Sequence, residues 1–485
     1  MRLAYRVWLI DGNDMLHPQS WSGGAGKRRW PIVVLLALLG IALARPANAD
    51  VPAPTELPAV LSLNEALRIF RTRGLDLLIA DAATRSAEGA VKIAGMIPNP
   101  VFSGSVGNAF TYANTDFSRT NCLQSGSQCS PWIFNVGVTD SAALEDSLSG
   151  KRYLRLKVAR NALAAAKLNR VDAERNITFQ VKSAYVTLAQ AVRAYAFAKE
   201  VQTTNVTTLK KFQDRYSAGA LNEGDLQRIE VQKLEADQSL DSASMALRQA
   251  RIALAFLLGV RGVVPEFGVD TSVLDYSIPP SLQDPTEVAL LRTALDHRPD
   301  LHAAGYMLTS AAAQIELVRR QRFPDITFGV NYAWGGFGGL STNGPLQAPT
   351  LTFSLSMPIP LFYQLQGEVR QAEALYDTNA LTHAKATAQI VSDVSSGLSG
   401  FITAKKLVER MEGPRRDGGG LLQSARGAFE AIARQYDRGA TGVTVTDYLD
   451  ALRTYIATKL EYFGDLTTYW TAVYELEQAV GVDLR

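Results

Sequence analysis

The sequence from Asp325 to Met357 constrains the fold more than any other part of the chain. Large apolar residues alternate there with small or polar ones, both before and after a Gly-rich turn. This period of two is typical of a β-hairpin with one apolar and one polar face. The remaining sequence has too few strands to cover that face in a sandwich. A bilayer is one candidate cover, and only a closed barrel leaves no unpaired strand edge there. The apolar positions are Ile326, Phe328, Val330, Tyr332, Trp334, Leu351, Phe353, Leu355 and Met357.

The same alternation predicts a second hairpin over residues 101–139, and the chain repeats itself around the two hairpins. At a shift near 224 residues, Pro100 corresponds to Pro324, each directly before a hairpin. Further on, a Tyr-x-x-Gly turn at 216–219 corresponds to another at 436–439. This register predicts a duplicated unit of helix, hairpin, long helix, turn and long helix.

Long helices are predicted for most of the remaining chain. Residues 141–216 contain no proline and read as nearly unbroken helix, with a heptad seam of the kind found in coiled coils. At 1.5 Å per residue this segment would span about 110 Å, too long for a compact domain. Shorter helices are predicted at 63–95 and 286–322, and a long one at 367–436 with a break near 412–420. The predicted domains are a first repeat at 50–259, a linker at 260–285 and a second repeat at 286–485.

Residues 1–49 are predicted to be a secretory signal peptide. A basic segment at 27–29 precedes an apolar run at 32–43, and Ala47-Asn48-Ala49 fits an A-x-A cleavage site. A short N-terminal anchor is the alternative, and Met15 is an alternative start. No other apolar run approaches the roughly 20 residues that a spanning helix needs.

The two cysteines, Cys122 and Cys129, lie in a polar loop of an exported chain. A disulfide is the expected state, and a redox or metal pair is the alternative. The net charge of +2 gives no reason to expect nucleic acid. The chain contains neither a Walker loop nor a GxSxG motif, and His297 and His302 lack the i,i+4 spacing of a helical metal pair. We therefore expect neither an enzyme nor a cofactor or metal site.

Three motifs give the chain a resemblance to a known family. They are the LNEAL…IPNP opening, the Met357-Pro358-Ile359-Pro360-Leu361-Phe362 segment after the central hairpin, and the Tyr-x-x-Gly turn followed by TDYLDALRTY. Over residues 61–484 the chain resembles the TolC-like outer membrane efflux protein family. The resemblance implies a mainly α fold with a small membrane β-barrel. Four strands from each chain of a homotrimer would form a 12-strand barrel, continued through the periplasm by an α-helical barrel.

The resemblance also implies a function. The chain would be the outer membrane exit duct of a tripartite efflux or type I secretion system, extending into the periplasm. Its partners would be a periplasmic adaptor and an inner-membrane pump, and its cargo drugs, metal ions or other toxic molecules. The residues alone leave another class open, a periplasmic coiled-coil structural or adaptor protein without a pore. Such a soluble protein would not be expected to expose the apolar hairpin face.

Two aspartates are assigned to the duct only through the resemblance. Asp447 and Asp450 match the carboxylates that ring the narrowed periplasmic end in the family, although Gly439 to Asp447 is about two residues longer here. Rings of carboxylates attract cations. The alternative is that both are solvated acids in the first turn of a helix, which is also the expected role of Asp225. The other residues assigned to the tip turns, with packing as an equal alternative for the tyrosines, are Tyr216, Gly219, Tyr436 and Gly439.

Overall fold

The computed structural model describes residues 57–108, 132–335, 349–413, 419–438 and 442–484. All of these belong to one compact unit, residues 54–485. The predicted signal peptide, the Cys122–Cys129 pair and Gly439 lie outside the described residues.

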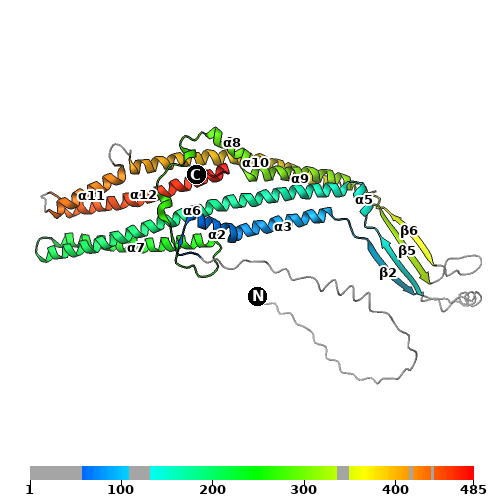
Figure 1. Cartoon of the computed structure of the whole chain (residues 1–485), viewed down its shortest axis with the longest axis horizontal. Helices are drawn as coiled ribbons and strands as arrows, with labels where there is room; N and C mark the ends of the chain where they lie inside the picture. The colour runs from blue at the N-terminus through cyan, green and yellow to red at the C-terminus, as the bar shows by residue number, and fades with distance from the viewer. Residues whose placement is uncertain (1–56, 109–131, 336–348, 414–418, 439–441, 485) are drawn as a thin grey trace, which may run out of the picture. The chain divides into compact units, whose positions relative to one another are not determined.

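Four strands form one antiparallel sheet at one end of this unit (Figure 1). They are β2 (Val101–Asn108), β3 (Trp132–Thr139), β5 (Thr327–Gly335) and β6 (Thr350–Ser356). The order in the sheet is β2-β3-β5-β6, so the strands of the two hairpins lie side by side. The strands occur where the period-two alternation predicts them, and β3 joins one hairpin to the other by pairing with β5.

The register of the sheet separates two chemically different faces. Residues directly opposite each other on neighbouring strands point to the same face. One such row contains Phe102, Val138, Val330 and Phe353, and the next residues along the strands form the row Ser103, Gly137, Asn331 and Thr352. The alternation seen along each strand therefore becomes one continuous apolar face and one continuous small or polar face.

The helices form two hairpin-like pairs beyond the sheet (Figure 1). The first repeat contains α2 (Leu63–Arg73), α3 (Leu75–Gly95), α5 (Ala143–Leu148), α6 (Lys151–Ser217) and α7 (Glu223–Leu257). The second contains α8 (Glu287–His297), α9 (Pro299–Gln321), α10 (Gln366–Glu412), α11 (Leu421–Asp437) and α12 (Val445–Val480). At 1.5 Å per residue α6 alone is about 100 Å long. Next to the sheet, α3 packs on α6, α6 on α9 and α9 on α10. Among the described residues no helix is long and apolar enough to cross a membrane.

Three segments that the sequence predicts as continuous helix are broken. Gly74 separates α2 from α3, and Arg298 separates α8 from α9, where Pro299 opens the second helix. Gly150 separates α5 from α6 with a φ of +77°, a backbone conformation that glycine adopts without a steric penalty. A Cβ at Gly74 would lie 2.6 Å from Cδ2 of Phe70, so the chain turns there around a packed ring. Gly74 and Arg298 are 224 residues apart, the same shift as the repeat.

The predicted linker at 260–285 is a packed belt rather than a loose connection. It contains β4 (Gly268–Val269), which pairs in parallel with β1 (Val60–Leu61), and the short 3-10 helices η2 (Thr271–Leu274) and η3 (Pro280–Leu282). The buried hydroxyl of Tyr185 on α6 donates to the carbonyl of Leu61 at 2.8 Å. The main core of the unit includes residues of this belt together with α2, α6, α10 and α12.

Arg298 is a buried ionic hub in this region. Its side chain is 4% exposed and its guanidinium donates to Asp300 at 2.6 and 3.1 Å and to Asp393 at 2.7 Å. It also donates to the carbonyl of Ala479 at 3.3 Å, so it joins the start of α9 to α10 and to the end of α12. Burial alone would raise the pKa of Asp300, but the hydrogen bonds and charge of Arg298 outweigh burial and lower it.

Candidate functional site: an open sheet and a helical tip

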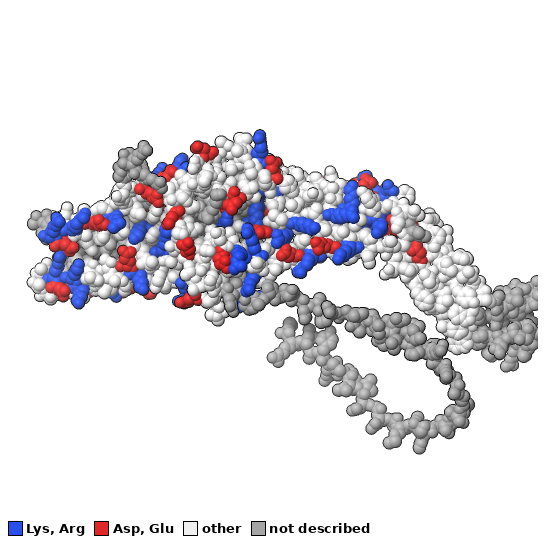
Figure 2. Space-filling model, in the orientation of Figure 1, with Lys and Arg blue, Asp and Glu red and all other residues white. Residues whose placement is uncertain are grey.

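The four strands contain no Asp, Glu, Lys, Arg or His. In Figure 2 they form an uncharged surface next to helices that carry many charges of both signs. The apolar face of this sheet is uncovered within the described unit: Phe102 is 72% exposed, Phe353 75% and Leu355 67%. Exposed apolar patches of this kind mark membrane or protein contacts, because water solvates them poorly.

The opposite face is lined by hydroxyls, amides and glycines. The amide of Asn135 donates to the Ser105 hydroxyl at 3.3 Å. A Cβ at Gly137 would lie 1.8 Å from Oδ1 of Asn331, so the Asn331 side chain lies across the glycine of the neighbouring strand. This face therefore carries short, neutral and mostly polar side chains, which suit the wall of a water-filled lumen.

Both outer strands of the sheet have a free edge among the described residues. Neither β2 nor β6 has a second neighbour in the sheet. Free edges leave backbone N–H and C=O groups unpaired, which a bilayer does not tolerate. An apolar environment thus requires further strands on both sides.

Several aromatic side chains lie on the apolar face of the sheet. Trp334 stacks on Phe134 at 5.5 Å and lies 5.6 Å from Tyr332, measured between ring centroids. Trp132 is 46% exposed at the far end of β3. Tyr363 follows the sheet and donates to Glu368 at 2.6 Å, and Tyr112 lies outside the described residues. Aromatic side chains near strand ends are typical of the interfacial belts of membrane barrels.

At the other end of the helices, a small apolar cluster joins the two helical hairpins near their turns (Figure 1). Its buried members are Phe212 of α6, Ile229 of α7, and Val445 and Leu449 of α12. Burial of these side chains holds the α6–α7 pair against α12.

Tyr436 belongs to this cluster, whereas Tyr216 does not. The ring of Tyr436 stacks on Phe212 with centroids 5.4 Å apart, and the guanidinium of Arg215 lies 5.2 Å from its centroid. Burial raises the pKa of Tyr436. Tyr216 is 42% exposed. Gly219 has a φ of +72° in the first turn, which explains why a glycine stands there.

Asp225 and Asp447 have the same structural role in the two repeats. Asp225 accepts from the Asn222 side chain at 2.6 Å, and its N–H donates back to Asn222 at 2.8 Å. Asp447 accepts from the Thr444 N–H at 2.8 Å and from its hydroxyl at 2.7 Å. Hydrogen bonds from the backbone and side chain of Thr444 lower the pKa of Asp447. Each aspartate therefore caps the first turn of its helix.

Asp450 is different, because its carboxylate has no hydrogen-bond or ion-pair partner in the described part of the chain. It is exposed one turn beyond Asp447 on α12. The nearby cation Arg453, one turn further along α12, is engaged elsewhere. Arg453 donates to Gln232 at 2.9 Å and to Glu235 at 3.0 Å, and both acceptors belong to α7. Of the two aspartates that the resemblance assigns, Asp450 is the one whose carboxylate is exposed and unpaired among the described residues.

Sequence reasoning did not identify the residues that fasten the two hairpins together at the tip. Besides Arg453, Arg228 of α7 donates to the Thr446 hydroxyl of α12 at 2.8 Å. No periodic pattern marks such pairs. The Thr444-x-x-Asp447 spacing, by contrast, is a recognisable capping box and predicts the start of α12.

Thr444→Ala is expected to destabilise the first turn of α12 by about 1 kcal/mol, because an N-cap hydroxyl is lost. Hydrogen exchange of the amides at 446–448 should then accelerate about fivefold, since exchange follows the local opening equilibrium. Thr454→Ala is the control, since the Thr454 hydroxyl bonds only to a carbonyl of its own helix. Equal exchange rates in the two variants would contradict the capping role of Thr444.

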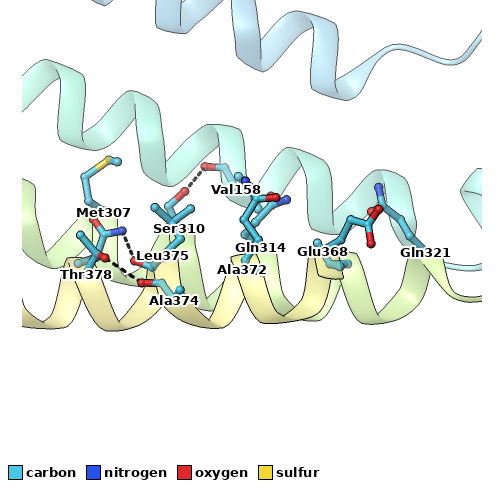
Figure 3. Close-up of a pocket in the computed structure, with 14 residues that line it drawn as sticks. Val158, Met307, Ser310, Gln314, Gln321, Glu368, Ala372, Ala374, Leu375 and Thr378 are labelled. Carbon is cyan, nitrogen blue, oxygen red and sulfur yellow. Dashed lines mark hydrogen bonds between the residues drawn. The ribbon is translucent and has the colours of Figure 1, made fainter. Parts of the chain in front are cut away.

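A groove of about 610 Å³ lies between α6, α9 and α10, close to the sheet (Figure 3). Amide side chains line it together with aliphatic ones, and the Ser310 hydroxyl donates to the Val158 carbonyl at 3.0 Å. No group of three or more His, Cys, Asp or Glu residues in the described ranges is arranged to hold a metal ion. The groove thus offers packing surface and hydrogen bonds rather than catalytic groups. Its amides are Gln314, Gln321, Gln371 and Asn379.

Comparison with known proteins gives one consistent result. The family model of outer membrane efflux proteins matches residues 290–482. The cobalt-zinc-cadmium resistance protein CzcC of Cupriavidus metallidurans is 22% identical over 432 residues, which cover 88% of this chain and 92% of that protein. The CmeC outer membrane channel of Campylobacter jejuni superposes with a TM-score of 0.68 at 16% identity, covering 86% of this chain and 85% of CmeC. The open state of the MtrE outer membrane channel of Neisseria gonorrhoeae superposes with a TM-score of 0.65 at 19% identity, covering 91% of this chain and 97% of MtrE. The chain is thus similar to TolC-like outer membrane efflux proteins, and residues 290–482 match the model of that family.

Proposed function

We propose that three copies of this chain form the exit duct of a tripartite efflux system. The chain is an outer membrane protein and not an enzyme, as its similarity to outer membrane efflux proteins implies. The observation that carries the proposal is the open, uncharged four-stranded sheet with one apolar face that no part of the described unit covers. Soluble proteins rarely leave such a face uncovered. A closed barrel in the outer membrane would cover it with lipid.

Three copies are the proposed solution to the free edges of the sheet. Four strands cannot close on themselves, since the smallest known membrane barrels have about eight. Twelve strands from three copies leave no edge. The apolar face would then contact lipid, and the face with Ser103, Asn135 and Asn331 would line the lumen.

The helices would carry the duct from the barrel across the periplasm. Helices such as α6, about 100 Å long, suit a protein that spans a gap better than one that forms a globule. A periplasmic adaptor and an inner-membrane pump are the proposed partners at the tip. The duct itself performs no chemistry, so the energy for transport would come from the pump.

The charge that a solute meets would be set at the tip rather than in the barrel. The strand face proposed as the lumen wall is neutral. Three copies of Asp450, with Asp447 beside it, would place rings of carboxylates at the periplasmic mouth. Such rings concentrate cations and repel anions. Metal ions and small toxic molecules are the proposed cargo, in agreement with the name of the metal-resistance relative.

Single-channel recordings in a planar bilayer test the duct and the aspartate together. The native protein should give a small, cation-selective conductance. Asp450→Asn should reduce the preference for cations, because three carboxylates leave the mouth of the proposed trimer. Asp241→Asn, an exposed aspartate on α7, is the matched control and should change nothing.

The possible results separate the duct from the assigned site. An unchanged selectivity in Asp450→Asn would remove Asp450 from the mouth and leave the duct standing. Extraction of the native protein as a monomer without detergent would contradict the duct itself. That second result would favour the periplasmic coiled-coil alternative.

A further inference from the structure

The ends of the helices that lie next to the sheet form a basic rim. The rim comprises the two helical turns, about 10 Å, nearest the sheet in α3, α6, α9 and α10, with the segments that join them to the strands. Lys and Arg outnumber Asp and Glu there. Figure 2 shows Lys and Arg side chains on the helices directly beside the uncharged sheet. The residues of the rim are 89–100, 140–157, 315–326 and 357–372.

The acidic side chains of the rim already have partners. Glu145 and Asp325 both pair with the buried ammonium group of Lys151, at 3.1 and 2.7 Å. Their charge is therefore compensated within the protein, and the same holds for the other ion pairs of the rim. The remaining contacts are those of Asp146 with Arg155, Glu316 with Arg319, Glu368 with the Tyr363 hydroxyl and Asp140 with the N–H of Ala143.

Four basic side chains of the rim are different, because they are exposed and have no hydrogen-bond or ion-pair partner among the described residues. Other basic side chains there bind carboxylates or backbone carbonyls, as Arg320 binds the carbonyl of Ser149 at 3.1 Å. The four come from four different helices, so the uncompensated positive charge extends across the whole helix layer. They are Lys92 of α3, Lys157 of α6, Arg322 directly after α9 and Arg370 of α10.

Exposed aromatic rings accompany two of these cations. Tyr153 lies one turn before Lys157 on α6, and residues at this spacing share a face of the helix. Its exposed fraction is 66%, and that of Phe323, directly after Arg322, is 64%. A ring beside a long basic side chain is typical of a membrane interface. There the ring contacts the ends of the acyl chains and the cation reaches the headgroups.

The groove of Figure 3 lies on another side of the helices. On α10 the groove is lined by a row of residues spaced four and three apart. Arg370 is not in that row, because it shares a side of α10 with Glu373, three residues further on. Glu373 accepts from Arg319 of α9 at 3.3 Å, so this side carries charges where the groove carries amides. The row that lines the groove contains Gln371, Leu375 and Thr378.

The length of the strands fixes the depth of the rim in the proposed barrel. The described strands have between 7 and 9 residues. A strand of this length measures about 26 Å, and with a tilt of about 40° it rises about 20 Å. The apolar band of a membrane barrel is about 25 Å tall. The strands therefore occupy nearly the whole hydrocarbon layer, and the helix ends begin where the headgroups begin.

We propose that Lys92, Lys157, Arg322 and Arg370 bind the headgroups of anionic phospholipids in the periplasmic leaflet of the outer membrane. Phosphate oxygens accept the charge-assisted hydrogen bonds that these four side chains do not make within the protein. An exposed Lys or Arg close to an anionic membrane surface favours that surface about fivefold. The inference rests on the proposed membrane-inserted duct, and it adds a contact that selects the lipid around the duct.

The lipids retained by the protein test this contact. The full chain is reconstituted into vesicles of equal parts phosphatidylcholine and phosphatidylglycerol, extracted in mild detergent, and the bound headgroups are quantified by mass spectrometry. In the native protein phosphatidylglycerol should exceed phosphatidylcholine about twofold, less than the effect of one cation because lipids of one leaflet alone reach the rim. High salt should abolish the excess, since it screens exposed charges. So should the rim variant, which combines Lys92→Gln, Lys157→Gln, Arg322→Gln and Arg370→Gln.

A matched control removes the same number of positive charges far from the sheet. Its four positions are also exposed and without a hydrogen-bond or ion-pair partner in the described ranges. The control should retain the excess of phosphatidylglycerol seen with the native protein. Bilayer conductance of each variant verifies that it still folds and inserts. The control combines Lys199→Gln, Lys210→Gln, Arg248→Gln and Arg410→Gln.

Three results would overturn the headgroup contact and leave the duct intact. The first is a native protein that conducts but retains both lipids equally. The second is a conducting rim variant that keeps the native excess. The third is a control variant that loses the excess as fully as the rim variant, because net charge and not the rim would then select the lipid. Native protein that neither inserts nor conducts would instead contradict the duct on which the inference rests.

Discussion

Phe353→Arg is expected to prevent stable insertion of the protein into the outer membrane. Phe353 lies on the apolar face of β6 and is 75% exposed. An arginine on the lipid face of a barrel costs about 2–4 kcal/mol near the bilayer midplane. Three copies in one trimer raise the cost to about 6–12 kcal/mol, which is comparable to the total stability of a typical domain.

Thr352→Arg, one residue away, is the matched control. Thr352 lies on the polar face, opposite Asn331. There the same charge would meet water in the lumen, so the variant should insert and show a reduced preference for cations. The measurement is the yield of detergent-extracted trimer from outer membranes, followed by bilayer recording. Equal insertion of the two variants would contradict the assignment of the apolar face to lipid.

Arg298→Met is expected to lower the free energy of unfolding by about 3 kcal/mol. Removing one partner of a buried ion pair leaves the other charge without compensation, which costs about 3–5 kcal/mol. The lower end of this cost is expected here. The side chains of Asp300 and Asp393 are 28% and 33% exposed, so water solvates part of the carboxylate charge that loses its partner. The carbonyl of Ala479 at the end of α12 also loses its side-chain donor.

The effect of Arg298→Met should depend on pH with a definite sign. In the native protein the lowered pKa of Asp300 contributes stability that is lost as the pH falls through the folded-state value. Without Arg298, burial raises the pKa of Asp300 instead, so its contribution is present at low pH and lost as the pH rises. The difference in stability between native protein and variant should therefore narrow from pH 7 to pH 4.

Thermal unfolding of the helices, followed by circular dichroism in detergent, measures this difference. Arg160→Met is the control, because Arg160 is exposed on α6 and has no hydrogen-bond or ion-pair partner among the described residues. It should leave the unfolding temperature unchanged. An Arg298→Met variant as stable as this control would show that the ionic hub contributes nothing net.

The strands were predictable because their signal is local. A period of two over five or more residues has few alternative explanations, and all four strands occur where it predicts them. The pairing of β3 with β5 is different, because it joins segments about 190 residues apart and no local pattern encodes such a contact.

The helix breaks and the ionic hub were not predicted, for a physical reason. Gly74 and Gly150 lie within sequences that otherwise favour helix, and a single glycine costs only about 1 kcal/mol there. The decision between a helical and a broken backbone comes from tertiary packing, such as the ring of Phe70 against Gly74. The burial of Arg298 could not be predicted either. The two carboxylates that it binds, those of Asp300 and Asp393, come from separate helices.

The candidate site was predicted in part. The repeated Tyr-x-x-Gly pattern predicted both tip turns, although of its two tyrosines Tyr436 stacks on Phe212 and Tyr216 is exposed. The sequence assigns the same role to Asp447 and Asp450, because a resemblance matches positions and gives no hydrogen bonds. The structure distinguishes them through Thr444, which donates to the Asp447 carboxylate, whereas the Asp450 carboxylate has no partner among the described residues.

The free edges of β2 and β6 also determine how the protein can reach its folded state. If the proposed trimer forms, a single exported chain cannot satisfy these edges or cover its apolar strand face by itself, so its β-part would be incomplete until other chains arrive. Its stability must then rise with chain concentration, as mass action requires for obligate oligomers. Until assembly, the same edges are templates for aggregation. The feature proposed to close the duct would thus make the single chain dependent on being held and delivered during export.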